Sequence, residues 1–326
     1  MSKAKGLRTW PHLAARRRRP SEYEIVSTNL HFRTMFEEYS ELSPSIPMNR
    51  WYRKYVRESP LQHDDWDAFR DPDEVTYRTY TVMQDGQETY VDGLLDEHDE
   101  LGHDRSLPDD WAATLARLYT PARFMLHAVQ MASAYVVITA PSSTVTCCAA
   151  YQMSDALRWV ARVAYRTSEL ADHHPGLGFG KNERSIWEQD PAWQGFRELS
   201  ERALVAYDWG EAVVALNVVV KPAIDEAFLR QLPAAGRRHG DLLLGLLTDA
   251  QLRDSERSRR WTKAFVEFAR QRAGNEEVLA RWVEKWAPIG DRAIEAFTAA
   301  LPESPEAGAT AVRDARAFRS GLGFVS

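Results

Sequence analysis

Glu100 and His103 form the only Glu-x-x-His motif of this sequence, although nine histidines occur among its 326 residues. Helical bundles that bind a di-iron centre need two such motifs on facing helices, together with one glutamate from each of two further helices. Gly102 and the neighbouring Asp99 and Asp104 are typical of the end of a helix. We therefore interpret Glu100 and His103 as parts of a solvated, charged turn and not as metal ligands.

Two further carboxylates lie on segments with helical periodicity, and neither has an imidazole at helical spacing. Asp155 is followed three residues later by Arg158, and Glu211 is followed by Val214. A guanidinium beside Asp155 would neutralise the carboxylate through charge-assisted hydrogen bonds, which is what a metal ion does at such a position. The sequence thus predicts no catalytic, cofactor-binding or metal-binding residue on this chain. That Asp155 and Glu211 are remnants of metal-ligand positions is a hypothesis, which a location of both on the outer surface of the bundle would contradict.

Other common catalytic patterns are also missing from the sequence. It contains no G-x-S-x-G motif and no phosphate-binding loop that ends in Gly-Lys-Ser/Thr. Its two cysteines, Cys147 and Cys148, are adjacent, so they can neither link distant segments nor supply a four-ligand zinc site. We interpret them as small core residues of a protein from a reducing compartment.

Composition argues against two classes of partner. Asp and Glu outnumber Lys and Arg by 47 to 41, and this net charge of -6 is the wrong sign for binding a phosphate backbone. The longest apolar stretches, such as residues 132–140 and 213–220, are much shorter than the roughly 20 residues that span a bilayer. Four arginines at residues 16–19 precede Pro20-Ser21-Glu22 and not the apolar core of a signal peptide. We expect a cytoplasmic protein that binds neither nucleic acid nor membranes.

Helical patterns dominate residues 71–302, which we expect to form one helical bundle. Asp71-Pro72 is typical of a helix N-terminus and predicts a helix that reaches about residue 100. Similar caps and apolar stripes predict further long helices over residues 121–140, 142–174, 190–221, 241–272 and 275–301. Residues 213–220 are β-branched enough to resemble a buried strand, but a single strand among helices would leave its edges unpaired. We therefore predict a helix there, kinked at Pro222, and an all-α, ferritin-like (ribonucleotide-reductase-like) fold.

The segments on either side of this bundle differ from it in pattern. Residues 1–70 combine many aromatics and prolines in an order that matches neither the helical nor the strand period. Disordered segments are poor in aromatics, so we predict an extended arm that docks on partner subunits, with a lid over the chain's own bundle as the alternative. Residues 303–326 are a C-terminal tail rich in Ala and Arg. The candidate interface residues are the large aromatics of the arm: Trp10, Tyr23, Phe32, Trp51, Tyr52, Tyr55 and Trp66.

Several motifs resemble the β subunit of bacterial multicomponent di-iron monooxygenases, and they are most similar to the toluene 4-monooxygenase branch. The resemblance extends from about Trp10 to Pro302, almost the whole chain. The matching motifs include Ser21-Glu-Tyr-Glu-Ile-Val-Ser27, Pro47-Met-Asn-Arg-Trp-Tyr52, Asp71-Pro-Asp-Glu-Val-Thr-Tyr77, Ser154-Asp-Ala-Leu-Arg-Trp159, Tyr207-Asp-Trp-Gly-Glu-Ala212 and Trp282-Val-Glu-Lys-Trp286.

This resemblance implies a structural subunit of an enzyme whose chemistry takes place on another chain. In the family, the hydroxylase component is an (αβγ)2 hexamer, the α subunit holds the di-iron centre, and the β subunit supports α and the dimer interface. The reaction inserts one oxygen atom from O2 into a hydrocarbon. Its electrons come from NADH through an FAD and iron–sulfur reductase and, in the toluene branch, a Rieske ferredoxin, and a small effector protein also takes part. None of these cofactors is expected on this chain.

Three alternatives remain open from the sequence. The same structural role is compatible with an isoprene, alkene or phenol monooxygenase, because the substrate and the position of attack are set by the α subunit. More distant alternatives are an autonomous di-iron oxidase, which the missing second Glu-x-x-His motif disfavours, and a helical adaptor without an enzyme partner.

Overall fold

The structure is a computed structural model that describes residues 19–28 and 47–324. Within these residues, side-chain caps decide where several of the long helices begin. Ser142, Asp190 and Asp241 each accept a hydrogen bond from a backbone N–H in the first turn of the following helix, as the sequence predicts. The elements are α1 (Glu22–Ser27), α2 (Pro47–Tyr52), η3 (Arg53–Arg57), η4 (Trp66–Ala68), α3 (Tyr77–Glu100), η5 (Asp104–Ser106), α4 (Asp109–Leu118), α5 (Ala122–Thr139), α6 (Ser143–His173), α7 (Glu183–Gln189), α8 (Pro191–Leu204), α9 (Trp209–Val214), η6 (Ala215–Val220), α10 (Lys221–Ile224), η7 (Asp225–Gln231), α11 (Leu232–Arg238), α12 (Leu242–Ala269), α13 (Asn275–Thr298) and α14 (Ala307–Gly321).

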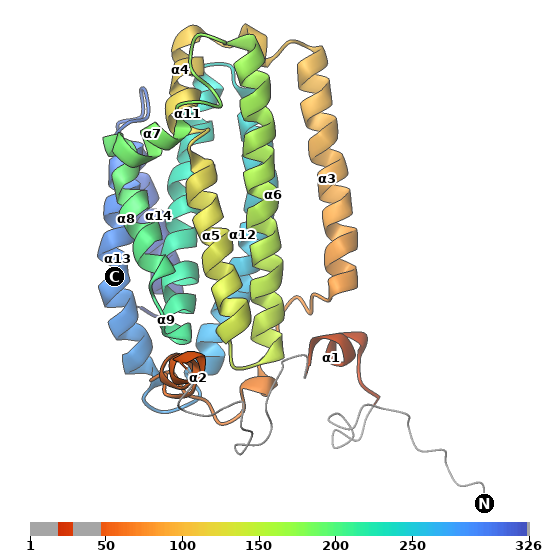
Figure 1. Cartoon of the computed structure of the whole chain (residues 1–326), viewed down its shortest axis with the longest axis vertical. Helices are drawn as coiled ribbons and strands as arrows, with labels where there is room; N and C mark the ends of the chain where they lie inside the picture. The colour runs from red at the N-terminus through yellow and green to blue at the C-terminus, as the bar shows by residue number, and fades with distance from the viewer. Residues whose placement is uncertain (1–18, 29–46, 325–326) are drawn as a thin grey trace, which may run out of the picture.

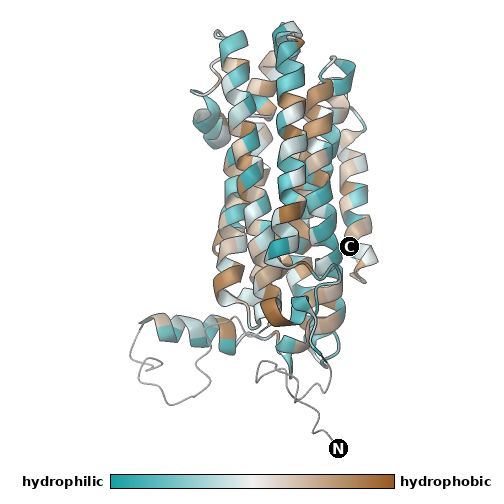
Figure 2. Cartoon of the chain, turned by 90° about the vertical axis from the view of Figure 1, so that its right-hand side faces the viewer, coloured by the Kyte–Doolittle hydropathy of each residue, from teal (hydrophilic) through white to brown (hydrophobic). Residues whose placement is uncertain are grey.

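The long helices lie side by side in one elongated bundle (Figure 1), which confirms the all-α, ferritin-like prediction. α5 and α6 form an antiparallel hairpin, α8 packs on α13, and α12 packs on α6 and on the long broken helix from α9 to α11. α3 stands on one side of the bundle and contacts α12 through a small apolar cluster that contains Leu94, Leu95 and Leu243. In Figure 2, hydrophobic and hydrophilic residues alternate along these helices, as is typical of amphipathic helices that share a core. No helix in the described part of the chain is long and apolar enough to span a membrane.

The first long helix begins five residues later than the sequence predicts, at Tyr77 and not at Pro72. Glu74 has a φ of 46°, a left-handed conformation through which an α-helix cannot run. The side chain of Asp71 accepts hydrogen bonds from the backbone of Asp73 and Val75 and so stabilises a turn. α3 starts instead after Thr76, which forms a capping box with Thr79.

The predicted helix over residues 190–221 is also interrupted. α8 ends at Leu204, and α9 starts after Asp208, whose carboxylate accepts hydrogen bonds from the backbone of Gly210 and Glu211. The ambiguous stretch at residues 213–220 is helical, as predicted, but residues 215–220 form the π-helix η6. Another π-helix, η7, comes before Pro233. Because proline lacks an N–H and its ring clashes with the carbonyl four residues earlier, the wider turns before Pro222 and Pro233 let one long helix continue past both prolines.

Residues 303–326, described from the sequence as a C-terminal tail, contain a packed helix, α14. Ala307, Ala311 and Ala315 recur every four residues on its buried face, and Arg319 is fully buried on the same face. The guanidinium of Arg319 donates to the carboxylate of Asp291 in α13 over 2.7 Å. α14 also packs on α13 and on η7, so it closes one side of the bundle.

Gly195 marks the closest approach of two helices. A Cβ atom at this position of α8 would lie 2.6 Å from the Cα atom of Ala293 in α13, and backbone cannot move aside as a side chain can. We expect Gly195→Ala to destabilise the full chain by about 1–3 kcal/mol, as overpacking does in other cores. Gly93→Ala is the matched control, because a Cβ there meets no atom within 4 Å. It should stabilise α3 by about 0.5–1 kcal/mol. Urea unfolding followed by circular dichroism measures both, and equal stabilities of the two variants would contradict the packing argument.

Candidate functional site: buried ion pairs in the bundle interior

Two Asp-x-x-Arg motifs on the antiparallel helices α6 and α12 meet in the interior. Arg158 donates to its own motif's Asp155 over 3.0 Å and to Asp254 of the other helix over 2.8 Å. Arg257 is bonded to Asp155 and lies 3.6 Å from Asp254. Each guanidinium thus serves both carboxylates, and the four residues, here called the Asp–Arg quartet, join the two helices reciprocally. Asp155 and Asp254 are 3% and 1% exposed, and acidic groups buried so deeply need such partners to offset the loss of water.

Helix α3 completes the hydrogen bonding of the quartet. The hydroxyl of Tyr80 donates to Asp155 over 2.9 Å, and the amide of Gln84 donates to Asp254 over 2.9 Å. Burial, together with the negative charge of Asp155, raises the pKa of Tyr80, so its hydroxyl remains a donor. Trp159 donates its indole N–H to the second oxygen of Asp254. The quartet therefore ties three helices together and leaves its carboxylates fully engaged.

These side chains do not fit a di-iron centre. Such a centre needs two histidines and carboxylates that are free to ligate, whereas Asp155 and Asp254 are bound by guanidinium groups and no imidazole contacts them. In residues 19–28 and 47–324, no group of three or more His, Cys, Asp or Glu side chains could hold a metal ion. What the arrangement can do is hold helices in register.

A second ion-pair network, here called the Arg166 triad, lies between α6, η5 and the start of α12. Arg166 is 0% exposed and donates to Asp104 and Asp241 over 2.8 Å each. Asp241 also accepts the indole N–H of Trp111 over 3.0 Å, while its other oxygen caps α12. Burial opposes ionisation of Asp104, but Arg166 and His103 outweigh it and hold its pKa well below its usual range. The triad therefore fixes the N-terminus of α12 against the middle of α6.

The structure does not bring the metal-ligand candidates of the sequence together. The imidazole of His103 donates to the carboxylate of the neighbouring Asp104, and Glu100 is exposed. Asp155 is buried in the Asp–Arg quartet, whereas the carboxylate of Glu211 binds the Lys285 ammonium over 2.6 Å and the Trp286 indole over 2.9 Å. Neither Asp155 nor Glu211 lies on the outer surface, because their side chains are 4% and 15% exposed. The hypothesis that they are remnants of ligand positions therefore stays open.

The described part of the aromatic arm rests on the chain's own bundle. Trp51 donates its indole N–H to the hydroxyl of Tyr135 and packs against Tyr55 and Tyr207. Tyr52 packs against the main core, and Trp66 packs edge-on against Trp209 with their ring centroids 5.0 Å apart. The remaining candidates are Tyr23, which is buried and accepts a hydrogen bond from the backbone of Asp71, and Trp10 and Phe32, which lie outside the described residues. Contact of these seven residues with a partner stays a prediction.

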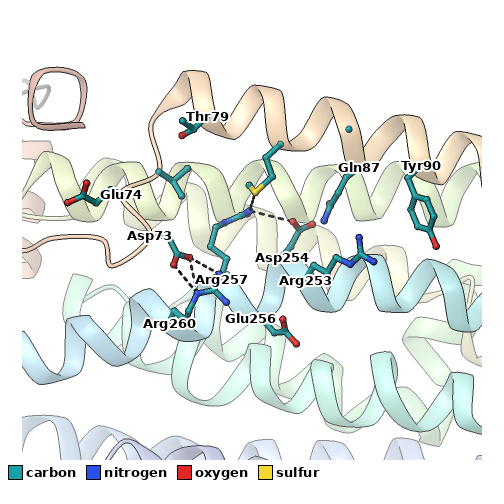
Figure 3. Close-up of a pocket in the computed structure, with 13 residues that line it drawn as sticks. Asp73, Glu74, Thr79, Gln87, Tyr90, Arg253, Asp254, Glu256, Arg257 and Arg260 are labelled. Atoms are coloured by element: carbon teal, nitrogen blue, oxygen red, sulfur yellow. Dashed lines mark hydrogen bonds and ion pairs between the residues drawn. The ribbon is translucent and has the colours of Figure 1, made fainter. Parts of the chain in front are cut away.

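A groove of about 720 Å³ separates α3 from α12 beside the quartet (Figure 3). At one end Arg260 pairs with Asp73 over 2.7 Å, and further along the guanidinium of Arg253 lies 5.7 Å from the ring centroid of Tyr90. Asp254 and Arg257 extend from α12 into the wall of the groove. The quartet is thus adjacent to the surface on the α3 side.

Cys148 lies in the core and Cys147 is partly buried beside it, and burial lowers the reactivity of both thiols. Burial and the nearby Asp71 raise the pKa of Cys147 to about 11, and the pKa of the fully buried Cys148 is also raised.

We expect Cys147 in the folded protein to react with iodoacetamide at pH 8 about two orders of magnitude more slowly than a free cysteine, because only the thiolate is nucleophilic. Mass spectrometry of labelled peptides against time measures this rate. The urea-unfolded chain is the control and should label both cysteines at the free rate, and fast labelling of the folded protein would contradict the prediction.

Asp254 and Arg257 were not identified from the sequence as partners of Asp155 and Arg158, although a repeated motif could have indicated them. The spacing Asp-x-x-Arg occurs once in α6 and once in α12, at residues predicted to be helical. Two equal motifs on two long helices are compatible with reciprocal pairing, but the sequence alone does not say which faces of the helices meet.

The comparisons with known proteins identify the class to which this bundle belongs. Residues 51–272 match the family model of the methane/phenol/alkene hydroxylases, and the chain belongs to this family. Among curated proteins, it is 50% identical over 298 residues to the β subunit of the hydroxylase component of the toluene-4-monooxygenase system of Ectopseudomonas mendocina, with 91% of each chain covered. It is 25% identical over 306 residues to a phenol 2-monooxygenase oxygenase component of Pseudomonas sp. (strain CF600), which covers 92% of this chain and 86% of the relative.

Solved structures agree with this classification. A chain of toluene 4-monooxygenase with toluene bound in its resting active site superposes with a TM-score of 0.87 and 49% identity, over 92% of this chain and 99% of that one. A chain of the phenol hydroxylase from Pseudomonas sp. OX1 has a TM-score of 0.83 at 20% identity and so shares the fold. The resemblance read from the motifs is thus confirmed.

Proposed function

We propose that this chain is the non-catalytic β-type subunit of the hydroxylase component of a multicomponent monooxygenase that hydroxylates toluene or a related aromatic hydrocarbon. The observation that carries the proposal is the 50% identity to a toluene-4-monooxygenase hydroxylase β subunit over 91% of both chains. The identity to phenol and propane monooxygenase components is 25% or lower, which favours the toluene branch over a phenol or propane enzyme.

The interior of the bundle supports a structural role. Its buried carboxylates are occupied by Arg158, Arg257 and Arg166, which make rigid links between helices where a catalytic bundle needs free ligands. We propose that the di-iron centre lies in the α partner of an (αβγ)2 hexamer. NADH, FAD and the iron–sulfur and Rieske clusters would then belong to the electron-transfer partners, and the effector protein would bind transiently in the cytoplasm.

Co-expression tests this assignment. The chain is produced alone and together with the α and γ subunits from the same organism, and iron is measured in each purified sample. We expect the hexamer to contain iron in proportion to α, and the chain alone to bind no stoichiometric iron and to be less soluble. Two iron atoms per isolated chain with an oxo-bridged absorption band would overturn the proposal, and so would failure to co-purify with α.

We further propose that residues 1–70 dock on the partner subunits as well as on this chain. Met48 of α2 is 71% exposed, so one large apolar side chain of the arm remains available for contact with a partner. The variant Met48→Ser should fold as the parent protein does, because this side chain is largely exposed, but it should co-purify less α subunit. Undiminished co-purification would contradict a docking role of this part.

A further inference from the structure

Lys221 is a buried lysine at the centre of the long broken helix. It is 5% exposed and lies between the π-helices η6 and η7, at the start of α10. Its ammonium is 4.7 Å from the ring centroid of Trp159 in α6 and 3.5 Å from the hydroxyl of Ser255 in α12. No carboxylate of the described residues lies within ion-pair distance of this ammonium. Ser255 links it to one instead, since the Ser255 hydroxyl donates to the carboxylate of Asp225 over 2.7 Å. The ammonium, hydroxyl and carboxylate thus form a short relay inside the bundle.

The charges around this relay show why a cation is needed there. Asp225 and Glu226, both nearly fully buried on η7, share the single guanidinium of Arg259 from α12. Glu226 has the half-exposed Arg230 as a second partner, whereas the side-chain partners of Asp225 among the described residues are Ser255 and Arg259. Asp155 of α6 and Asp254 of α12 are balanced within their quartet by Arg158 and Arg257. Burial lowers the pKa of Lys221, while Asp225, Asp155 and Asp254 act against this shift.

We infer that the Lys221 ammonium is the cation that, through the Ser255 hydroxyl, balances the buried carboxylate of Asp225, whose partner Arg259 is shared with Glu226. The inference goes beyond the proposed subunit role, since it concerns the charge balance of the chain itself and does not depend on the hydrocarbon substrate. It assigns Lys221, Ser255 and Asp225 to one unit that holds the long helix against α6 and α12.

Hydrogen exchange of the purified hydroxylase complex, read by mass spectrometry on peptides from residues 215–231 and 250–260, tests the inference. We expect Lys221→Met to lower protection of these peptides by 30-fold or more. Lys263→Met removes an equally long lysine that is 60% exposed, and it should change protection less than threefold. Protection in Lys221→Met equal to or above that of the parent protein would overturn the inference.

A double-mutant cycle separates charge from packing. Asp225→Asn should also lower protection, but the double variant Lys221→Met/Asp225→Asn should lose at least tenfold less than the product of the two single losses, because it removes both charges together. Losses that simply multiply would show that Lys221 only fills space and would overturn the inference. If Lys221→Met does not assemble, recovery of the complex in the double variant supports the inference, and a double variant that also fails to assemble overturns it.

Discussion

Replacing Arg166 by methionine should destabilise the chain by about 3–5 kcal/mol, because the change leaves Asp104 and Asp241 buried without their cation. Methionine retains much of the volume of the side chain, so the effect reports on charge more than on a cavity. Urea unfolding of the full chain, followed by circular dichroism, measures it. At pH 7 the loss should be complete, since Asp104 is ionised there, and it should shrink as acid protonates the carboxylates.

The sign of this pH dependence follows from the depressed pKa of Asp104. A carboxyl group with a folded-state pKa below its unfolded value of about 3.9 contributes stability above that pH and loses it as the pH falls through the folded-state value. Arg184→Met is the matched control, because that side chain is 79% exposed and its ion pair is with the neighbouring Glu188 on the surface. The change should alter stability far less than Arg166→Met does, since exposed ion pairs contribute little. Equal losses in Arg166→Met and Arg184→Met would show that the triad contributes no more than a surface pair.

Trp209→Ala should cost about 3–5 kcal/mol and should also release part of the aromatic arm. Trp209 is 1% exposed, and Trp66 of the arm packs edge-on against its ring. Two neighbouring contacts attach the same part of the arm to the start of α9: the hydroxyl of Ser59 donates to Asp208 over 2.9 Å, and Leu61 packs closely on Gly210. Limited proteolysis should therefore cleave Trp209→Ala between residues 57 and 70 faster than the parent protein, in addition to the loss seen by urea unfolding.

The conservative variant Trp209→Phe distinguishes packing from a general loss of structure. It keeps an aromatic ring against Trp66 and should lose less than half as much stability as Trp209→Ala, with proteolysis of the arm close to that of the parent. If Trp209→Ala unfolds at a lower urea concentration but its arm is cleaved no faster, the arm is held by other contacts.

The sequence was sufficient to predict the class of fold because caps and apolar stripes are local features. Asp190-Pro191, Ser142 and Asp241 each start a helix where their residue types indicate. The late start of α3 was not predictable from Asp71-Pro72, since the left-handed conformation of Glu74 depends on the surroundings that bury Asp71. Local chemistry thus locates most helix ends, and tertiary packing decides the exceptions.

The interior network was only partly predictable for a different reason. The pairing of Asp155 with Arg158 within one helix follows from their spacing, and it is present in the structure. The partners Arg257 and Asp254 come from another helix about 100 residues later, and their approach depends on helix rotation that no local pattern specifies. In the same way, the aromatic composition of residues 47–70 indicates a docking segment but not which surface it covers.

The π-helices η6 and η7 of the long broken helix have a consequence for how this chain can change over evolutionary time. A π-turn is equivalent to one extra residue in an α-helix, and one residue rotates the following side chains by about 100°. Residues before η6, between η6 and η7, and after η7 therefore follow three different rotational phases along one helix axis. Removal of the extra residue in η6 would turn Lys221 and everything after it away from their present neighbours at once. The rotation of all residues after each insertion therefore has to be kept or lost together. A helix without these insertions would present a different set of side chains to the centre of the bundle.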